Sequence, residues 1–166
     1  MSAVMKLKTL QGHLESLNGF AEPKVQYEQY VTPAHLAATA LYTIQTQFES
    51  IENCTVLDAG CGPGIWGIGA ALLGAGVVTA VDIDEDALEV FRENVEEMEV
   101  TNIDAVQCDF LDSKVCRSHI AKKVKDWGMK GSVIAEMKYH LPATYRFHKQ
   151  HSMDIAVDIW RVYHSH

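Results

Sequence analysis

The chain has 166 residues, of which 48% are hydrophobic and 22% are charged, with a formal net charge of −8. This length and composition are those of one globular domain, and they exclude a disordered or fibrous protein. The sequence has no signal-peptide pattern and no apolar run long enough to span a bilayer, so no membrane association is expected. The four cysteines have no C-x-x-C spacing, which favours reduced thiols, and no metal site is predicted.

The first part of the chain, residues 1–53, is predicted to be a helical cap. Residues Val4–Leu17 have the pattern of an amphipathic helix. Ala34–Gln47 form a second predicted helix, and Pro33 suits its first turn. A polar and aromatic connector, which starts at Pro23, joins the two helices.

Strands and helices alternate at short spacing in residues 54–112. The predicted elements are, in order, the strand Cys54–Ala59, the helix Ile65–Leu73, the strand Val77–Val81, the helix Asp84–Met98 and the strand Ile103–Gln107. Such alternation is typical of a parallel sheet with helices on both faces. We therefore expect an α/β, Rossmann-like core in this part of a single domain that spans residues 1–166.

The pattern changes in residues 113–166. Residues 113–151 contain nine Lys or Arg against two acids, whereas residues 1–112 contain four against eighteen. Val115–Trp127 is predicted to be a basic helix, followed by two strands, Ser132–Tyr139 and Met153–Val162, which form a C-terminal antiparallel hairpin. The basic segment fits either a polyanion contact or a solvated helix face, and composition leaves both open.

The most informative stretch is the glycine loop, residues 60–64, which follows the strand that ends near Asp58. Three glycines alternate there, as Gly60, Gly62 and Gly64. Glycine is needed where the backbone has a positive φ or touches a ligand, and the helix that follows offers its positive end to an anionic group. The spacing differs from the G-x-G-x-x-G of dinucleotide sites and resembles motif I of the class I S-adenosylmethionine (SAM) methyltransferases.

Two further acids follow the next two predicted strands. Asp82 comes about twenty residues after the loop, where a carboxylate can hold ribose hydroxyls. Asp109 follows the third strand and can accept a hydrogen bond from an adenine amine. Because the carboxyl ends of parallel strands meet at one edge, the pattern predicts SAM as cofactor and disfavours a nicotinamide. In the alternative interpretation, these acids do not contact a ligand. Asp82 and the nearby Asp84 then only cap the next helix, and Asp109 is a turn residue.

Matching segments before and after the loop extend the resemblance over nearly the whole chain. They include Glu28-Gln29-Tyr30, Leu73-Gly74-Ala75-Gly76, Asp82-Ile83-Asp84-Glu85-Asp86, Val106-Gln107-Cys108-Asp109 and Leu141-Pro142-Ala143. Together they resemble the methyltransferase-like protein five family, which methylates N6 of an adenosine in small-subunit ribosomal RNA. The resemblance implies a SAM-dependent enzyme, ribosomal RNA as substrate, a small zinc-ribbon activator subunit as partner, and a cytoplasmic and nuclear (nucleolar) location.

The loop, the acids and the resemblance together indicate a SAM pocket. The resemblance implies that the pocket is built from Gln29, Thr32, Gly60, Pro63, Ile65, Asp82, Asp109 and Phe110, and the glycine-loop pattern adds Asp58, Gly62 and Gly64. The family has a cysteine where this chain has Pro63, which stiffens the loop and removes one N–H donor. Cys61 is a weak candidate nucleophile, since no histidine is close in sequence. For RNA contact we single out the aromatic and basic run of Tyr145, Arg146, Phe147, His148 and Lys149, with core packing as the alternative for its aromatic residues.

The catalytic motif of the family is missing. The family carries Asn-Pro-Pro-Phe after its fourth strand, where the Asn oxygen and a proline carbonyl accept the N–H bonds of the target amine and the aromatic ring stacks on the flipped base. No Asn-Pro occurs in this chain. The resemblance implies that about fifty residues, roughly one βαβ unit and a strand, are absent between Asp112 and Ser113. No catalytic residue is therefore assigned.

Loss of this segment would reduce the predicted sheet by strands four and five. One hypothesis is that the final hairpin docks on the first strand and completes a sheet of five strands. Two functions follow from the sequence: an rRNA adenine-N6 methyltransferase, or a form that binds SAM, RNA or the activator partner without methyl transfer.

Overall fold

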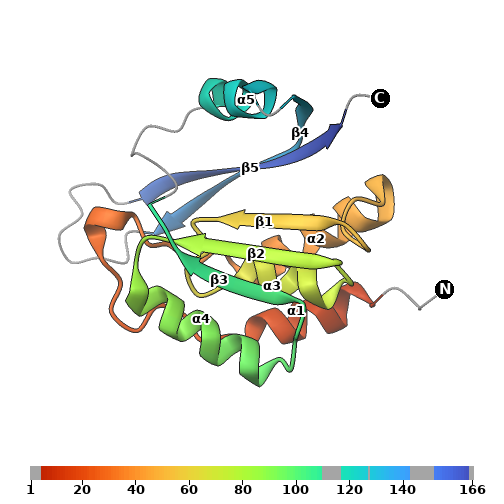
Figure 1. Ribbon diagram of the computed structural model, residues 1–166. Coiled ribbons are helices and arrows are strands. Elements are labelled where there is room, and N and C mark those ends of the chain that lie inside the picture. The colour runs from red at the N-terminus through yellow and green to blue at the C-terminus, as the bar shows by residue number, and fades with distance from the viewer. Residues whose placement is uncertain (1–4, 110–116, 127, 143–151, 165–166) are drawn as a thin grey trace. The chain divides into compact units, whose positions relative to one another are not determined.

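The computed structural model describes residues 5–109, 117–126, 128–142 and 152–164. The chain forms two compact units, unit 1 (Met1–Phe110) and unit 2 (Leu111–His166) (Figure 1). None of the helices in the described ranges is both long and apolar enough to cross a membrane.

Unit 1 contains every helix and strand predicted for it, with ends that shift by a few residues. In chain order the elements are α1 (Leu7–Glu15), the short 3₁₀ helix η1 (Val25–Tyr27), α2 (Ala34–Phe48), β1 (Thr55–Ala59), α3 (Ile65–Leu72), β2 (Val77–Asp82), α4 (Glu85–Glu97) and β3 (Ile103–Gln107). The sequence pattern does not predict η1, which lies in the connector between α1 and α2.

The three strands of unit 1 form a parallel sheet in the order β1–β2–β3. Thr55 of β1 lies opposite Val77 of β2, and Val78 lies opposite Ile103 of β3. The carboxyl ends of all three strands therefore meet at one edge, where ligands bind in open α/β sheets.

Both helices that connect these strands pack on the same face of the sheet. On α3, a Cβ at Gly67 would lie 3.2 Å from Ile103 Cδ1 and 3.4 Å from Val78 Cγ1, so the helix backbone is close to the sheet. On α4, Leu88 and Phe91 form a buried cluster that also includes Ala80 of β2. The chain steps from β1 to β2 to β3 in one direction, and right-handed crossovers then place both helices on one side (Figure 1).

The opposite face of the sheet exposes apolar side chains. Leu57 is 51% exposed, Val77 53% and Val106 48%. The α/β class with a C-terminal hairpin is confirmed, but the sequence pattern predicts helices on both faces. In the described part of unit 1, the helices packed on the sheet cover one face only.

Unit 2 is a helix and a long hairpin, as predicted. Its elements are α5 (Arg117–Asp126), β4 (Met129–Pro142) and β5 (Ser152–His164), and the two strands pair antiparallel from Met129 with His164 onward. Val124 of α5 is buried and lies 3.1 Å from where a Cβ would be at Gly131 of β4. Among the described strands, β4 pairs with β5, and β1–β3 form the parallel sheet of unit 1. The docking of the hairpin on the first strand stays a hypothesis.

Candidate functional site

The glycine loop joins β1 to α3 and has the backbone shape that requires glycine. Gly60, Gly62 and Gly64 have φ angles of 75°, 50° and 99°, which L side chains rarely adopt. A Cβ at Gly64 would lie 2.6 Å from the Phe91 ring, and one at Gly62 would lie 2.7 Å from Phe20 Cζ. At Gly60, by contrast, nothing lies within 4 Å. Gly60 therefore leaves open space in which a ligand can approach the backbone.

The loop is held in place by the end of β2. The N–H groups of Gly60 and Cys61 donate to the carbonyl oxygen of Val81 at 2.8 and 3.0 Å. The N–H of Gly62 donates to Asp82 Oδ2 at 2.7 Å. The loop thus has a defined conformation before any ligand binds.

Asp58 supports the first turn of the helix that follows the loop. Its Oδ2 accepts a hydrogen bond from the N–H of Gly67 at 2.8 Å, which satisfies one of the first-turn donors of α3. Burial raises the pKa of Asp58 to about 6, against the effect of this bond and with a smaller contribution from the charge of Asp82. In this structure the predicted pocket residue Asp58 anchors α3. The N–H groups of Ile65 and Trp66, which also lie in the first turn, have no acceptor within the helix.

Asp82 stands between the glycine loop and the turn that starts α4. While Oδ2 accepts from Gly62, Oδ1 accepts from the N–H of Asp84 at 2.9 Å. Each carboxylate oxygen can accept a second hydrogen bond, so Asp82 can hold the loop and a ligand hydroxyl together. Asp84 is the N-cap of α4 and accepts from the N–H of Asp86, which confirms the cap interpretation for Asp84.

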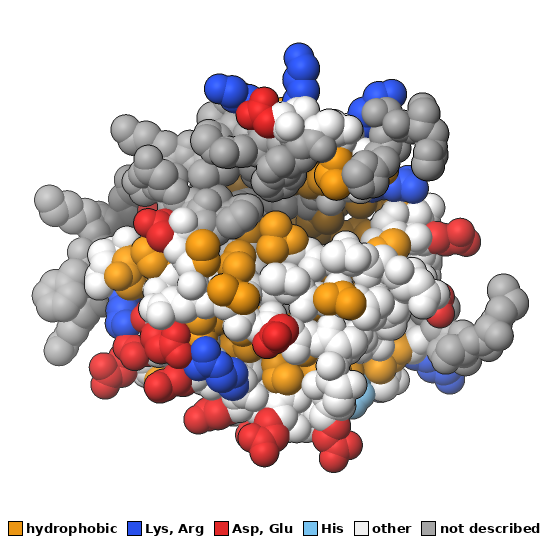
Figure 2. All heavy atoms as spheres, in the orientation of Figure 1, with side chains coloured by type: hydrophobic (Ala, Val, Ile, Leu, Met, Phe, Trp, Pro, Cys, Tyr) orange, Lys and Arg blue, Asp and Glu red, His pale blue; other side chains and the backbone are white. Residues whose placement is uncertain are grey.

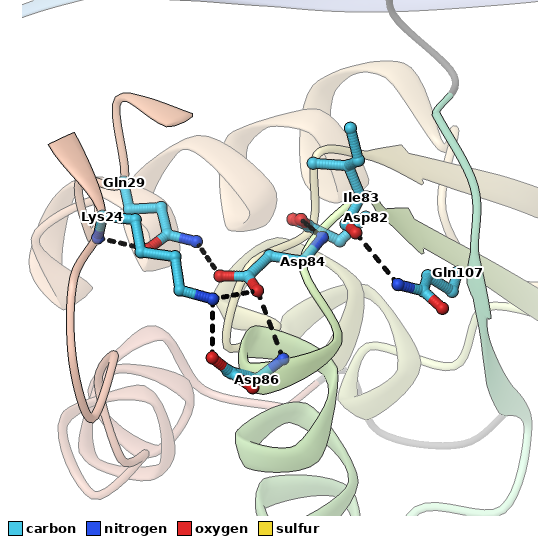
Figure 3. Close-up of polar contacts among 7 residues, drawn as sticks. All are labelled: Lys24, Gln29, Asp82, Ile83, Asp84, Asp86 and Gln107. Atoms are coloured by element: carbon cyan, nitrogen blue, oxygen red, sulfur yellow. Dashed lines mark hydrogen bonds and ion pairs between the residues drawn. The ribbon is translucent and has the colours of Figure 1, made fainter. Parts of the chain in front are cut away.

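A polar cluster ties the connector between α1 and α2 to this turn (Figure 3). Lys24 Nζ lies 2.6 Å from Asp84 Oδ1 and 2.6 Å from Asp86 Oδ2. Gln29 Nε2 donates to Asp84 Oδ2 at 2.6 Å, and its Oε1 accepts from the N–H of Lys24 at 2.7 Å. Burial opposes the ionisation of Asp84, but Lys24, Gln29 and the Asp86 N–H together lower the pKa of Asp84.

Two predicted pocket residues of the connector are buried. Gln29 is 7% exposed and Thr32 is 5% exposed. The hydroxyl of Thr32 accepts a hydrogen bond from Trp66 Nε1 at 3.2 Å, which links the connector to α3. Gln29 and Thr32 thus hold the connector beside the β2–α4 turn and α3.

The third predicted ligand contact, Asp109, is exposed and follows β3. The N–H of Cys108 donates to the carbonyl oxygen of Asp82 at 2.9 Å, so the end of β3 lies beside Asp82. Gln107 Nε2 donates to the carbonyl oxygen of Ile83 at 3.2 Å and adds a second link (Figure 3). Phe110 and the predicted RNA-contact residues lie outside the described residues; the latter are Tyr145, Arg146, Phe147, His148 and Lys149.

Cys61 has the environment of a core residue. It is 5% exposed and packs with Ala80, Leu88 and Phe91. Burial raises the pKa of the Cys61 thiol far above its usual range, and the nearby Asp58 and Asp82 add to this effect. A thiolate nucleophile is therefore disfavoured at this position. Among the described side chains, no group of three His, Cys, Asp or Glu could hold a metal ion.

Three residues that shape the loop are absent from the sequence-based prediction. They are Phe20, Phe91 and Asn94, and each contacts the loop from a distant part of the chain. Asn94 had a detectable signal, because it is a polar residue within the apolar stripe of α4 that includes Leu88 and Phe91. Phe20 had none, since the contact depends on how the connector folds back.

Comparison with known proteins gives consistent matches. Residues 33–126 match the family model of the ribosomal protein L11 methyltransferase (PrmA). The chain is 42% identical to the rRNA N(6)-adenosine-methyltransferase METTL5 of Danio rerio, over 95% of this chain and 98% of that protein. It is 36% identical to the Mettl5 protein of Drosophila melanogaster, over 96% and 97%.

A solved structure agrees with the fold. A Pyrococcus horikoshii protein, described as a candidate RNA methyltransferase, matches with a TM-score of 0.68 and 26% identity, over 96% of this chain and 98% of that one. The Danio rerio alignment runs over 203 positions, more than the 166 residues of this chain, so that relative has residues without a counterpart here. With two relatives above 30% identity along nearly their whole length, the chain belongs to the rRNA N6-adenosine-methyltransferase family.

Proposed function

We propose that this chain binds SAM at the carboxyl edge of the β1–β3 sheet, as a member of a family that methylates N6 of an rRNA adenosine. SAM as cofactor follows from the methyltransferase family and fold. The observation that carries the proposed site is the position of Asp82, whose carboxylate touches the glycine loop and whose carbonyl oxygen accepts from the residue before Asp109. In this arrangement Asp82 would hold the ribose hydroxyls and Asp109 the adenine amine.

The residues present fit such a ligand. Gly60 leaves its Cβ position open, which allows the cofactor to lie against the backbone. The first turn of α3, next to the loop, favours an anionic group such as the carboxylate of SAM. SAM would supply the transferable methyl group, while the loop, Asp82 and Asp109 would bind and orient it.

RNA as substrate is supported by the family, and the distribution of charge limits where RNA can bind. The outer face of α4 is acidic, and Asp and Glu side chains gather there toward the lower left of Figure 2. Such a face repels phosphates, so RNA would bind elsewhere. The basic run Tyr145–Lys149 stays our prediction for the RNA contact.

A second function is favoured by two observations. The chain contains no Asn-Pro, and the alignment with its Danio rerio relative is longer than the chain itself. A chain that holds the methyl donor but lacks the group that presents the acceptor amine would bind SAM, RNA or a partner without turnover.

The cofactor site is tested by titration of the purified chain with SAM in a calorimeter. We expect a dissociation constant in the micromolar range, and no measurable binding by Asp82→Ala. Asp104→Ala is the matched control, because Asp104 is an exposed acid of β3 away from the site. Equal binding by the wild type and Asp82→Ala would refute the assigned site.

Turnover is tested with labelled SAM and small-subunit ribosomal RNA. Transfer of label to adenosine by this 166-residue chain would establish the enzyme and rule out the binding-only form. SAM binding without transfer would establish the reverse. The assay is run with and without the activator partner, so that a missing subunit is not mistaken for a missing motif.

The partner and the location are also proposals. A small zinc-ribbon activator subunit is expected from the resemblance, and the exposed Leu57, Val77 and Val106 support a protein partner for unit 1. Copurification of the two chains after co-expression would test this. A cytoplasmic and nucleolar location can be checked by imaging a tagged chain.

A further inference from the structure

One buried amide joins three separate segments of unit 1. Asn94 of α4 has no exposed surface. Its Oδ1 accepts a hydrogen bond from the N–H of Asn18 at 2.8 Å, and its Nδ2 donates to the carbonyl oxygens of Asn18 at 3.0 Å and Pro63 at 2.9 Å. Both amide hydrogens are thus used, and the side chain has one orientation.

The bond to Pro63 acts on the start of α3. The carbonyl of Pro63 and the N–H of Gly64 belong to one planar peptide group. Asn94 holds the carbonyl, and the carbonyl oxygen of Cys61 accepts from the Gly64 N–H at 2.9 Å. Because Gly64 is the N-cap of α3, this peptide plane sets the direction of the helix start and of its free N–H groups.

The bonds to Asn18 bring the connector to the same loop. Two residues later, the ring of Phe20 lies against Gly62, 2.7 Å from where a Cβ would be. A buried amide that loses its partners is costly, so the connector and the loop are stable only when both are in place.

We propose that Asn94 is a positioning residue for the cofactor. It holds the Pro63–Gly64 peptide and the Asn18 segment in the arrangement that SAM binds, and it acts through them. The inference rests on the proposed SAM site and adds a residue that lies on α4, outside the loop and the two ligand acids.

The test compares two Asn→Asp variants by SAM titration, at a temperature where both are folded. Asn94→Asp removes the donor to Pro63 and Asn18. Asn102→Asp is the matched control, since Asn102 Nδ2 donates to the carbonyl oxygen of Ala75 at 2.5 Å, at the amino end of the sheet. We expect about tenfold weaker binding for Asn94→Asp and unchanged binding for Asn102→Asp, since a lost hydrogen bond of this kind corresponds to roughly that factor. Unchanged binding by Asn94→Asp would overturn the inference.

A second readout separates positioning from general loss of stability. Asn94→Leu removes all three bonds without adding a charge, and it is titrated with SAM and with methylthioadenosine, which lacks the carboxylate. Because Asn94 orients the anion-binding start of α3, the variant should lose more affinity for SAM than for methylthioadenosine. Equal losses for the two ligands would contradict a positioning role.

Hydrogen exchange of the wild type decides the question if neither Asn94 variant folds. Addition of SAM should slow exchange of the Asn18 amide, and it should leave the Gly76 amide, bonded to Cys54 at the amino end, unchanged. No change at Asn18 would overturn the inference. Failure of the wild type to bind SAM at all would instead overturn the proposed function, on which this inference rests.

Discussion

The glycine loop and the end of β3 contribute to the same edge of the sheet, but they differ in how firmly they are held. The loop is hydrogen-bonded to Val81 and Asp82, and two Phe rings lie against it, Phe20 at Gly62 and Phe91 at Gly64. Asp109 is exposed, and the bond from the preceding Cys108 N–H holds its strand end. A group that is already ordered costs little entropy on binding, so the loop side of the site should contribute more affinity than the β3 side.

The largest effect is expected from a methyl group added where the loop is tightest. Gly64→Ala combines a φ of 99° with a Cβ 2.6 Å from Phe91, and should lower the free energy of unfolding by about 2 to 4 kcal/mol. Gly60→Ala adds the φ strain alone, because its Cβ meets nothing within 4 Å, and should cost about 1 to 2 kcal/mol. Urea unfolding measures both, and equal losses would mean that the loop is not packed as described.

A pH effect should report the burial of the Asp58 carboxyl group beside α3. Its pKa is raised to about 6 in the folded chain, so between about pH 4 and 6 the folded state holds a proton that the unfolded state has lost. This contribution to stability is complete at low pH and disappears as the pH rises through about 6, a loss of roughly 3 kcal/mol. Urea unfolding at pH 4 and pH 7 gives the change of the free energy of unfolding with pH for the wild type and for Asp58→Asn. We expect the free energy to fall more between pH 4 and pH 7 for the wild type. Equal changes in the two proteins would disprove the prediction.

A conservative change at the firm side of the site should weaken the cofactor next. Asp82→Asn keeps the size of the side chain but removes its charge and one acceptor, so SAM affinity should fall by at least about tenfold. Asp104→Asn, at the exposed acid of β3, should leave the affinity unchanged. A smaller loss at Asp82 than at Asp109 would reverse the comparison between the two sides.

The smallest effect is expected at the exposed side. Asp109→Asn should weaken SAM binding by about threefold, because part of the gain from this contact is spent on ordering the strand end. The same calorimetric titration measures it. A loss as large as that of Asp82→Asn would show that the β3 end is as well ordered as the loop.

Local sequence patterns were enough to predict the strands β1–β3, the helices between them and the edge at which Asp82 and Asp109 lie. Each of these depends on residues close in the chain, and the rule that carboxyl ends of parallel strands meet supplied the rest. The capping role of Asp84 followed in the same way, from an acid placed directly before a helix.

The contacts that hold the loop could not be predicted from local patterns. Asn94 is 31 residues from Pro63 and 76 from Asn18, so no short-range spacing indicates their hydrogen bonds.

The sequence by itself determined the elements, the glycine loop and the family, because these rest on residue type and spacing along the chain. Only the tertiary structure decided that both connecting helices cover one face, that Asp58 anchors a helix, and that a buried amide on α4 is hydrogen-bonded to the glycine loop. Those features depend on burial and on hydrogen bonds between distant segments, which exist only once the chain has folded.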